Sequence, residues 1–163
     1  MLLKKKKKER KTIVLIDYEN ISFKAIEKGE IIDFQKLHEF LLEFGEIIFA
    51  FIFLPDHRVY SLPENLSDLG FEIVLCQKTI ESDKTEDTVD IHLIQSGMKF
   101  CNFSEITDII VVGHDKHMTH LIKEAKNRKK QVSIIGTEKI SNVLKQVIDI
   151  KNIYDLPLKD KSR

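Results

Sequence analysis

The stretch Thr12–Ile16 (TIVLI), followed at once by Asp17–Asn20 (DYEN), decides the fold of this chain. The apolar run is continuous and rich in β-branched residues, which is typical of a strand buried on both faces of a parallel sheet. Asp17 stands where that strand ends, and open α/β folds place their ligands at this carboxyl edge. A desolvated carboxylate needs a partner, and a divalent cation is a common one. The stretch therefore predicts a parallel sheet with a functional acid at its edge.

Outward from this stretch, apolar strands alternate with amphipathic helices. Further strands are expected at 46–53, 71–76, 108–112 and 131–135, with a short one near 150–154. Helices are expected at 34–44, 61–70, 86–101, between Asp115 and about 128, and 137–147, with a polar loop at 77–85. This alternation predicts an α/β fold, a three-layer α/β/α sandwich with a central, mostly parallel sheet.

The chain length and its charge pattern predict one domain with charged ends. A chain of 163 residues is long enough to bury a proper core. We expect a flexible basic arm at 1–11, the domain at 12–155 and a charged, frayed tail at 156–163. The arm holds seven cations and one acid in a chain with no net charge. Such an arm can hold a polyanion or act only as a solubilising tail, and composition leaves both interpretations open.

The composition also indicates where the protein resides. Cys76 and Cys101 are too few for a disulfide framework, and their apolar neighbours indicate buried, reduced thiols. The longest apolar run, at 47–54, is too short to span a bilayer, and the amino terminus does not resemble a secretory signal. We therefore expect a cytoplasmic protein without a membrane partner. A second basic cluster at 123–130 fits either a helix end or a nucleic-acid contact.

Three acids stand where a parallel sheet would bring them together. Asp17 and Asp115 follow the first and fourth expected strands, and Asp90 lies in the first turns of the helix after the third. Three carboxylates suit Mg²⁺ or Mn²⁺, which leave coordination sites open for phosphate. Asn20 is close enough to hold a carboxylate or a phosphate. Each acid taken singly also fits a helix cap, a first-turn anion or a turn, so it is their joint placement that favours a metal site acting on phosphodiesters.

These residues carry a resemblance to the NYN domain (LabA-like, DUF88) family of the PIN-like nuclease superfamily. Asp17–Asn20 matches its Asp-x-x-Asn motif, 89–93 (VDIHL) resembles Val-Asp-Val-x-Leu, and 113–121 is similar to Ser-Gly-Asp-Ser-Asp-Phe-x-Pro-Leu. The similarity covers residues 12 to about 150. It implies a PIN-like sandwich and a metal-dependent endoribonuclease. In that case Mg²⁺ or Mn²⁺ is held by Asp17, Asp90 and Asp115, Asn20 supports the site, RNA is the partner, and a homodimer is expected.

The chain departs from the family's motifs at several positions. His117 stands at the second acid of the third motif, Ser96 at a later helix acid, and Asp87 at the lysine before the helix. Asp87, or Glu86, is a candidate replacement ligand. Lys116 places a cation in an anionic site, where it can offset charge or bind phosphate.

The third motif is also rich in histidine. His117 is a candidate general acid, and the histidines at 114, 117 and 120 form, together with Asp115, a candidate set for Mn²⁺ or Zn²⁺. Ordinary surface histidines at the start of a helix fit the same pattern.

Three functions therefore compete. The first is a PIN-like endoribonuclease, and the second is a catalytically degenerate NYN domain that binds RNA or protein. The third is a receiver-like or phosphatase domain in which Asp17 is phosphorylated.

Overall fold

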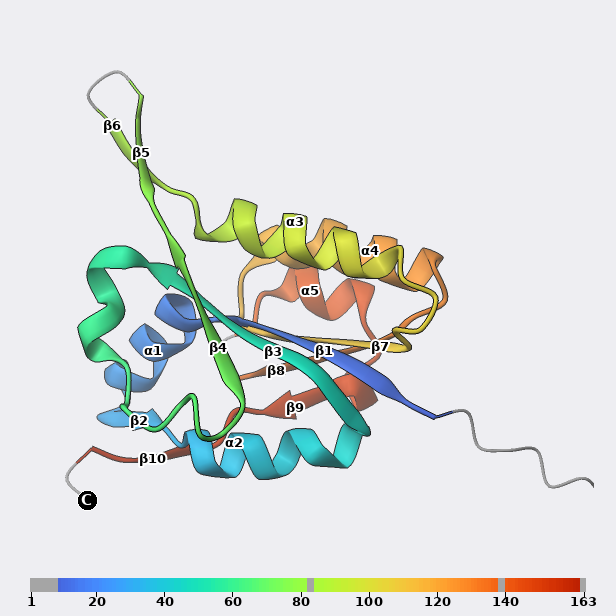
Figure 1. Cartoon of the computed structure of the whole chain (residues 1–163), viewed down its shortest axis with the longest axis horizontal. Helices are drawn as coiled ribbons and strands as arrows, with labels where there is room; N and C mark the ends of the chain where they lie inside the picture. Colours follow the sequence, from blue (N-terminus) through green and yellow to red (C-terminus); the bar gives the residue numbers. More distant parts are fainter. Residues whose placement is uncertain (1–8, 82–83, 138–139, 162–163) are drawn as a thin grey trace, which may run out of the picture.

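Six parallel strands form the central sheet, in the order β4-β3-β1-β7-β8-β9 (Figure 1). The computed structural model describes residues 9–81, 84–137 and 140–161, and the side chains of 78–87 lie outside the description. The strands are β1 (Lys11–Asp17), β3 (Glu46–Pro55), β4 (Phe71–Cys76), β7 (Asp108–Val112), β8 (Gln131–Gly136) and β9 (Ile153–Asp155). The α/β prediction is confirmed.

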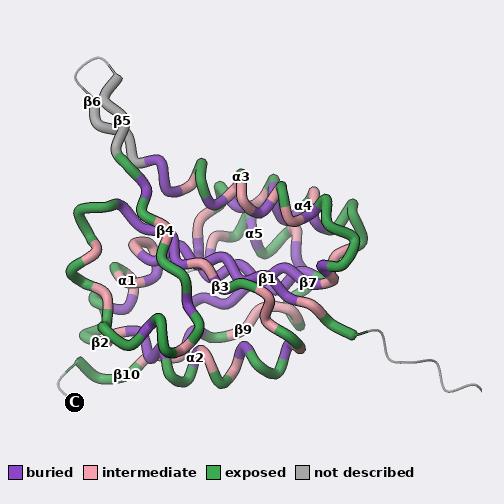
Figure 2. The backbone as a smooth tube through the Cα atoms, viewed as in Figure 1, coloured by how far each residue is buried: buried purple, intermediate pink, exposed green. Residues whose placement is uncertain are grey.

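Helices cover both faces of the sheet and enclose two hydrophobic cores. They are α1 (Tyr18–Glu27), α2 (Phe34–Leu41), α3 (Val89–Cys101), α4 (Thr119–Asn127) and α5 (Asn142–Val147). α1 and α2 lie on one face, and α3, α4 and α5 lie on the other (Figure 1). β1 contributes to both cores, with Ile13 and Leu15 on the α3 side and Val14 and Ile16 on the α1 side. This two-sided burial explains the unbroken apolar run of β1 (Figure 2).

The centre of the sheet is a topological switch point. β1 pairs with β3 on one side and with β7 on the other, both in parallel. Asp17 is in register with Phe53, and Ile16 with Val112, so the three strands end at the same level. In doubly wound sheets the crevice outside these carboxyl ends takes the ligand. The order also differs from the 2-1-3-4-5 order of receiver-like folds, so the topology does not support the receiver interpretation.

The helix expected at 34–44 agrees well with the structure. Asp33 caps α2 by accepting a hydrogen bond from the Lys36 amide, at 3.1 Å. A 3₁₀ turn, η1 (Leu42–Phe44), extends the helix to Gly45. Gly45 has a φ of 102°, and a Cβ there would lie 2.8 Å from the Arg10 carbonyl oxygen. Glycine therefore ends the helix for both conformational and steric reasons.

Two expectations in the first half of the chain were incomplete or wrong. No element was expected at 21–32, where the structure has most of α1 and a short strand, β2 (Glu30–Ile32). The helix expected at 61–70 is absent from these described residues, which form turns after a 3₁₀ helix, η2 (Asp56–Ser61). The Ser61 hydroxyl donates to the Arg58 carbonyl oxygen at 2.8 Å instead of capping a following helix.

The segments before α3 and α5 also differ from expectation. The polar loop at 77–85 is an antiparallel hairpin of β5 (Lys78–Glu81) and β6 (Lys84–Asp87), and its tip, 82–83, lies outside the described residues. α3 therefore begins at Val89 rather than at 86. α5 begins after Ser141, which caps it, rather than at Thr137. The Thr137 amide donates to His114 instead.

Both ends of the described chain belong to the fold more than expected. Arg10 forms an ion pair with Asp108, and Lys11 begins β1, so only 1–8 of the expected basic arm lie outside the described residues. Near the other end, Leu156 is buried, and β10 (Leu158–Asp160) pairs antiparallel with β2. The expectation of a frayed tail is therefore wrong for 156–160.

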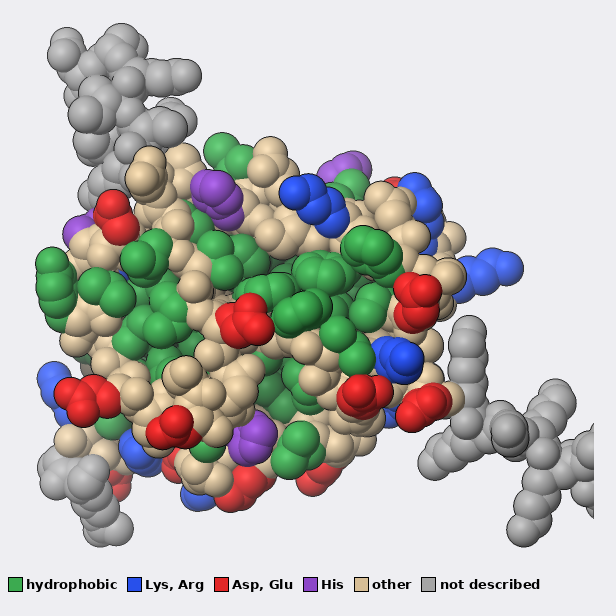
Figure 3. Space-filling view, viewed as in Figure 1, with side chains coloured by type: hydrophobic (Ala, Val, Ile, Leu, Met, Phe, Trp, Pro, Cys, Tyr) green, Lys and Arg blue, Asp and Glu red, His purple; other side chains and the backbone are tan. Residues whose placement is uncertain are grey.

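One edge of the sheet carries exposed apolar side chains. β4 is an outer strand, and its Ile73 and Leu75 are exposed. Hydrophobic side chains gather on the face of the molecule shown in Figure 3. Among the described residues, no helix combines the length and the hydropathy that crossing a bilayer requires.

Candidate metal centre at the carboxyl edge of the sheet

The three predicted acids line one cavity of about 190 Å³ at the carboxyl edge of the sheet. Asp17 ends β1 and is 5% exposed, and its side chain caps α1 by accepting from the Asn20 amide. Asp90 is the second residue of α3, and Asp115 follows β7 and caps a 3₁₀ turn, η3 (Lys116–Met118). The positions of these acids at strand ends and helix starts fit capping roles, and they also bring the carboxylates to one cavity.

The wall of this cavity is strongly acidic. It is lined by Asp17, Glu19, Asn20, Phe23, Val89, Asp90 and Asp115. These described residues include four acids and neither Lys nor Arg. Bringing four carboxylates together costs free energy unless a cation or a proton offsets their charge. The oxygen-rich donor set suits a hard divalent ion.

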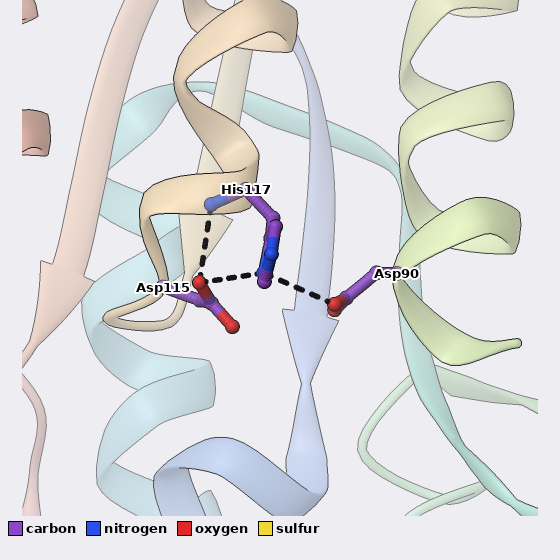
Figure 4. A group of neighbouring side chains, drawn as sticks. All are labelled: Asp90, Asp115 and His117. Atoms are coloured by element: carbon purple, nitrogen blue, oxygen red, sulfur yellow. Dashed lines mark hydrogen bonds and ion pairs between the residues drawn. The ribbon is translucent and has the colours of Figure 1, made fainter. Parts of the chain in front are cut away.

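His117 joins two of the acids into a compact group (Figure 4). Its Nδ1 lies 2.7 Å from Asp115 Oδ1 and 3.3 Å from Asp90 Oδ2. The hydrogen bond to Asp115 and the attraction of Asp115 and Asp90 raise the pKa of His117 above its ordinary 6.5. The imidazolium form can therefore balance these acids when no metal ion is bound.

The same three residues fit the geometry of a metal site. Asp90, Asp115 and His117 each offer a ligand atom, and these atoms lie within 4.8 Å of one another. Ligands on opposite sides of a Mg²⁺ ion lie about 4.2 Å apart, because each bond is about 2.1 Å. Mn²⁺ accepts the same carboxylates together with an imidazole nitrogen. The donor set therefore fits either ion after small side-chain movements.

A buried polar chain holds the edges of three strands together. The Asn20 side-chain oxygen accepts from the His114 amide at 3.0 Å and lies 2.9 Å from His114 Nδ1. On the other side of the ring, His114 Nε2 accepts from the Thr137 amide at 2.8 Å. Since Nε2 accepts, the proton of the neutral ring is on Nδ1 and is donated to Asn20.

This chain of hydrogen bonds explains what Asn20 and His114 do. It links α1, the loop after β7 and the end of β8, and so fixes Asp17 relative to Asp115. His114 is 4% exposed, and both of its ring nitrogens are engaged within the protein. The expectation that His114 could bind a metal is therefore wrong for this conformation.

Lys116, His120 and Ser96 lie around the site rather than in it. Lys116 is exposed and is not among the residues lining the cavity. His120 lies outside the group formed by Asp90, Asp115 and His117, and Ser96 lies farther along α3. The Asp87 backbone belongs to β6, and its side chain lies outside the described residues.

Sequence reasoning missed Glu19 and Phe23, which also line the cavity. Both lie on α1, the helix that was not assigned. The usable signal was the spacing of Tyr18, Ile21 and Ala25, which are the buried residues of that helix. This spacing follows the three-to-four-residue period of an amphipathic helix.

The fold and the site define a doubly wound α/β protein with an acidic, candidate metal-binding edge. The chain belongs to the NYN domain family, whose model matches residues 11–156. The chain is 29% identical over 158 residues to an uncharacterized protein of Methanocaldococcus jannaschii. That alignment covers 94% of this chain and 60% of the relative, so the chain spans about three fifths of that relative's length.

A solved structure shares the fold. A protein of unknown function from Vibrio parahaemolyticus superposes with a TM-score of 0.77 at 18% identity. The superposition covers 93% of this chain and 95% of that protein. At this level of identity the likeness establishes the architecture.

Proposed function

We propose that this NYN domain is a divalent-metal-dependent endoribonuclease of the PIN-like type. The observation that carries the proposal is the convergence of Asp17, Asp90 and Asp115 on one cavity at the topological switch point. Membership of the NYN family supports it, since PIN-like nucleases resemble this chain in their acid motifs. The substrate class, RNA, and the assignment to the LabA-like subfamily are parts of the same proposal.

Each residue has a role in this proposal. Asp17, Asp90 and Asp115 hold Mg²⁺ or Mn²⁺, with His117 as an accessory ligand. When bound, such an ion supplies Lewis-acid polarisation of the scissile phosphodiester. Asn20 is a positioning residue, because its side-chain oxygen is engaged by His114.

The proton steps fall to groups on the same edge. Hydrolysis removes a proton from the attacking water and delivers one to the leaving oxygen. A carboxylate of the cavity can accept the first proton. In the alternative role, with His117 protonated and not bound to the metal, its imidazolium, whose Nδ1 lies 2.7 Å from Asp115 Oδ1, can donate the second.

Other features of the chain support RNA recruitment, a homodimer and a cytoplasmic location. The basic residues of 1–8, which lie outside the described residues, would recruit RNA electrostatically. The exposed apolar side chains of Ile73 and Leu75 on the outer strand β4 support a homodimer. Cys76 and Cys101 are buried thiols that are not joined in a disulfide, which is consistent with the proposed cytoplasmic location.

One observation favours a second candidate, a degenerate domain that binds RNA without cleaving it. When it is protonated, His117 places a cation beside Asp90 and Asp115. If the imidazolium outcompetes divalent ions, the acids are balanced internally and the domain has no catalytic ion. The family's usual acid at this position would not have this effect.

A cleavage assay separates the two candidates. A pool of single-stranded and hairpin RNAs is incubated with Mn²⁺ and the wild-type protein, Asp17→Asn or Asp115→Asn. Asp68→Asn is the matched control, since Asp68 is an exposed acid in the turns before β4, at the other edge of the sheet. The nuclease proposal expects cleavage by the wild type and Asp68→Asn only. RNA binding without cleavage by the wild type would favour the degenerate domain.

A further inference from the structure

A second cavity lies directly beside the acidic one. It measures about 210 Å³ and lies between α1, β2 and η2. Glu19 and Phe23 line both cavities, so the two spaces meet along α1. A ligand held at the carboxylates can therefore extend into this second space.

An aromatic ring and a guanidinium form one wall of the junction. The Arg58 guanidinium carbon lies over the Phe23 ring, 5.2 Å from its centroid. Phe23 is 42% exposed, and the Arg58 side chain is 44% exposed. Guanidinium and aromatic planes are the surfaces on which unpaired nucleobases stack, and arginine also pairs with phosphate.

The position of Arg58 is built into the fold. Arg58 lies in η2, and the Tyr18 hydroxyl ties the end of that 3₁₀ helix to α1 by donating to the Ser61 carbonyl oxygen at 3.0 Å. Tyr18 is the residue after Asp17, so the acidic site and the arginine are held by adjacent residues. The ring, the cation and the carboxylates therefore keep a defined spacing.

Glu19 supplies an acceptor at the same junction. Its Oε2 is buried and accepts no hydrogen bond within the described residues. Its ion-pair partner is Arg58, whose Nε lies 3.8 Å away, beyond hydrogen-bonding distance. Leaving a buried carboxylate oxygen without a donor costs free energy, so a ligand that brings an N–H group is favoured here.

We propose that Phe23, Arg58 and Glu19 form a nucleotide subsite for single-stranded RNA. The inference rests on the proposed function, because the neighbouring phosphodiester is the one held at the acidic cavity. The base stacks on the Phe23–Arg58 pair, Arg58 contacts the flanking phosphate, and Glu19 accepts a hydrogen bond from an exocyclic amino group. The subsite therefore prefers the bases with an exocyclic amino group (cytosine, adenine and guanine) to uracil, whose only base N–H donor is on the ring.

The chemistry requires an unpaired nucleotide. A base in a duplex has both faces covered by its neighbours, and its amino group already donates to its partner base. An unpaired base offers its face to the stack and its amino group to Glu19. Acids elsewhere in the cavity repel phosphate, so a divalent ion is needed for the neighbouring phosphodiester to be held.

Binding of labelled RNA hexamers tests the proposal. Oligo(C), oligo(A) and oligo(U) are titrated with the full chain in Ca²⁺, which takes carboxylate ligands. Phe23→Ala and Arg58→Ala should each weaken oligo(C) binding about tenfold, as expected for one lost stacking partner. Glu19→Gln should bring the oligo(C) and oligo(U) affinities together, because glutamine can donate as well as accept.

Matched controls make the result specific. Phe103→Ala removes a ring that is 52% exposed at the far end of α3. Lys36→Ala removes an exposed cation of α2 that lines neither cavity. Both variants should bind like the wild type. Circular dichroism of all five variants establishes that each is folded.

The outcomes separate this inference from the nuclease proposal. Equal losses in Phe23→Ala and Phe103→Ala, or equal wild-type affinity for oligo(C) and oligo(U), would overturn the subsite even if Asp17-dependent cleavage occurs. Binding that depends on Phe23 and Glu19 without any cleavage would support the subsite and reject the nuclease. Absence of RNA binding by the wild type would overturn the subsite.

Discussion

The buried acids at the two ends of the central strands have different surroundings. Asp108 begins β7 and is 3% exposed, and Asp17 ends β1 and is 5% exposed. Asp108 is balanced locally, by the ion pair with Arg10 and by a hydrogen bond from the Thr107 hydroxyl at 2.6 Å. Asp17 instead faces the same cavity as Asp90 and Asp115. A buried carboxylate that pairs with a cation holds the fold together, whereas acids gathered in one cavity can also offer their oxygens to a metal ion.

The larger cavity of the protein does not lie at the carboxyl edge, where the candidate metal site is. The amino edge has a cavity of about 900 Å³, against about 190 Å³ for the acidic one. The charges on its wall are largely engaged within the protein: Arg10 pairs with Asp108, and Arg128 with Glu124. The arrangement of charge, rather than volume, therefore identifies the candidate site.

The largest effect that the comparison predicts is on metal-dependent stability. At a Mn²⁺ concentration one hundred times its Kd, the wild type should gain about 2.7 kcal/mol of unfolding free energy. Asp17→Asn should lose most of this gain, because one ligand charge is removed. Urea unfolding with and without Mn²⁺ measures it.

Asp108→Asn, at the opposite edge of the sheet, is the control for Asp17→Asn. It should lower the metal-free stability by about 1–3 kcal/mol, since Arg10 loses its partner, while the gain from Mn²⁺ stays intact. A loss of the Mn²⁺ effect in Asp108→Asn but not in Asp17→Asn would reverse our assignment of the two edges.

Breaking the polar chain behind the site should have the next largest effect. Asn20→Ala removes the acceptor of the His114 amide, so the loop carrying Asp115 loses its fixed position. We expect Mn²⁺ affinity to fall by about 10–100-fold, as for other residues that orient ligands. Isothermal titration calorimetry measures the affinity. Asn20→Asp keeps the acceptor and should recover part of it, which would not happen if the amide nitrogen were the essential group.

Replacing the histidine by the family's acid sharpens the comparison further. His117→Asp exchanges an internal cation for a fourth carboxylate near Asp90 and Asp115. Mn²⁺ should then bind about tenfold more tightly, because the metal no longer competes with the imidazolium. His120→Asp, one helical turn away, is the control and should leave the affinity close to that of the wild type. Weaker binding by His117→Asp would mean that the imidazole itself is an important ligand.

The smallest effect is the pH dependence of His117. Its pKa is raised by the hydrogen bond to Asp115, so the protonated form favours the folded state. In metal-free protein this stabilisation is fully present below the ordinary pKa of 6.5 and is lost as pH rises through the raised pKa. NMR titration of the imidazole should show the raised pKa. In Asp115→Asn the pKa should move back towards 6.5, and an unchanged value would contradict this account.

The strands and the positions of the acids could be predicted because their signals are local. β-branched runs define the strands at 12–16, 46–53, 71–76, 108–112 and 131–135, each within about two residues of the observed bounds. Because parallel strands have their carboxyl ends at the same edge of a sheet, Asp17 and Asp115 could be placed together at that edge from the sequence. The helix after Asp33 was equally clear, since a capping acid precedes it and Gly45 follows it.

The elements that were missed depend on contacts between distant residues. α1 had a local signal in the helical spacing of Tyr18, Ile21 and Ala25, and burial of these residues in the core on one face of the sheet holds it. β2 exists because β10 pairs with it from more than a hundred residues away. Ser61 resembled a helix cap, but its hydroxyl bonds back to the Arg58 carbonyl oxygen, and its own carbonyl oxygen accepts from the distant Tyr18 hydroxyl.

The sequence by itself determined the parallel α/β architecture and the three acids at one edge of its sheet, because hydrophobic period and strand direction are encoded locally. Only the tertiary structure decided that Asp108 is neutralised by Arg10, that His114 is a structural link and that His117 lies between Asp90 and Asp115. These roles depend on which side chains meet across the fold. A side chain's charge and hydrogen-bonding capacity are known from its type, but the partner that satisfies them is set by packing.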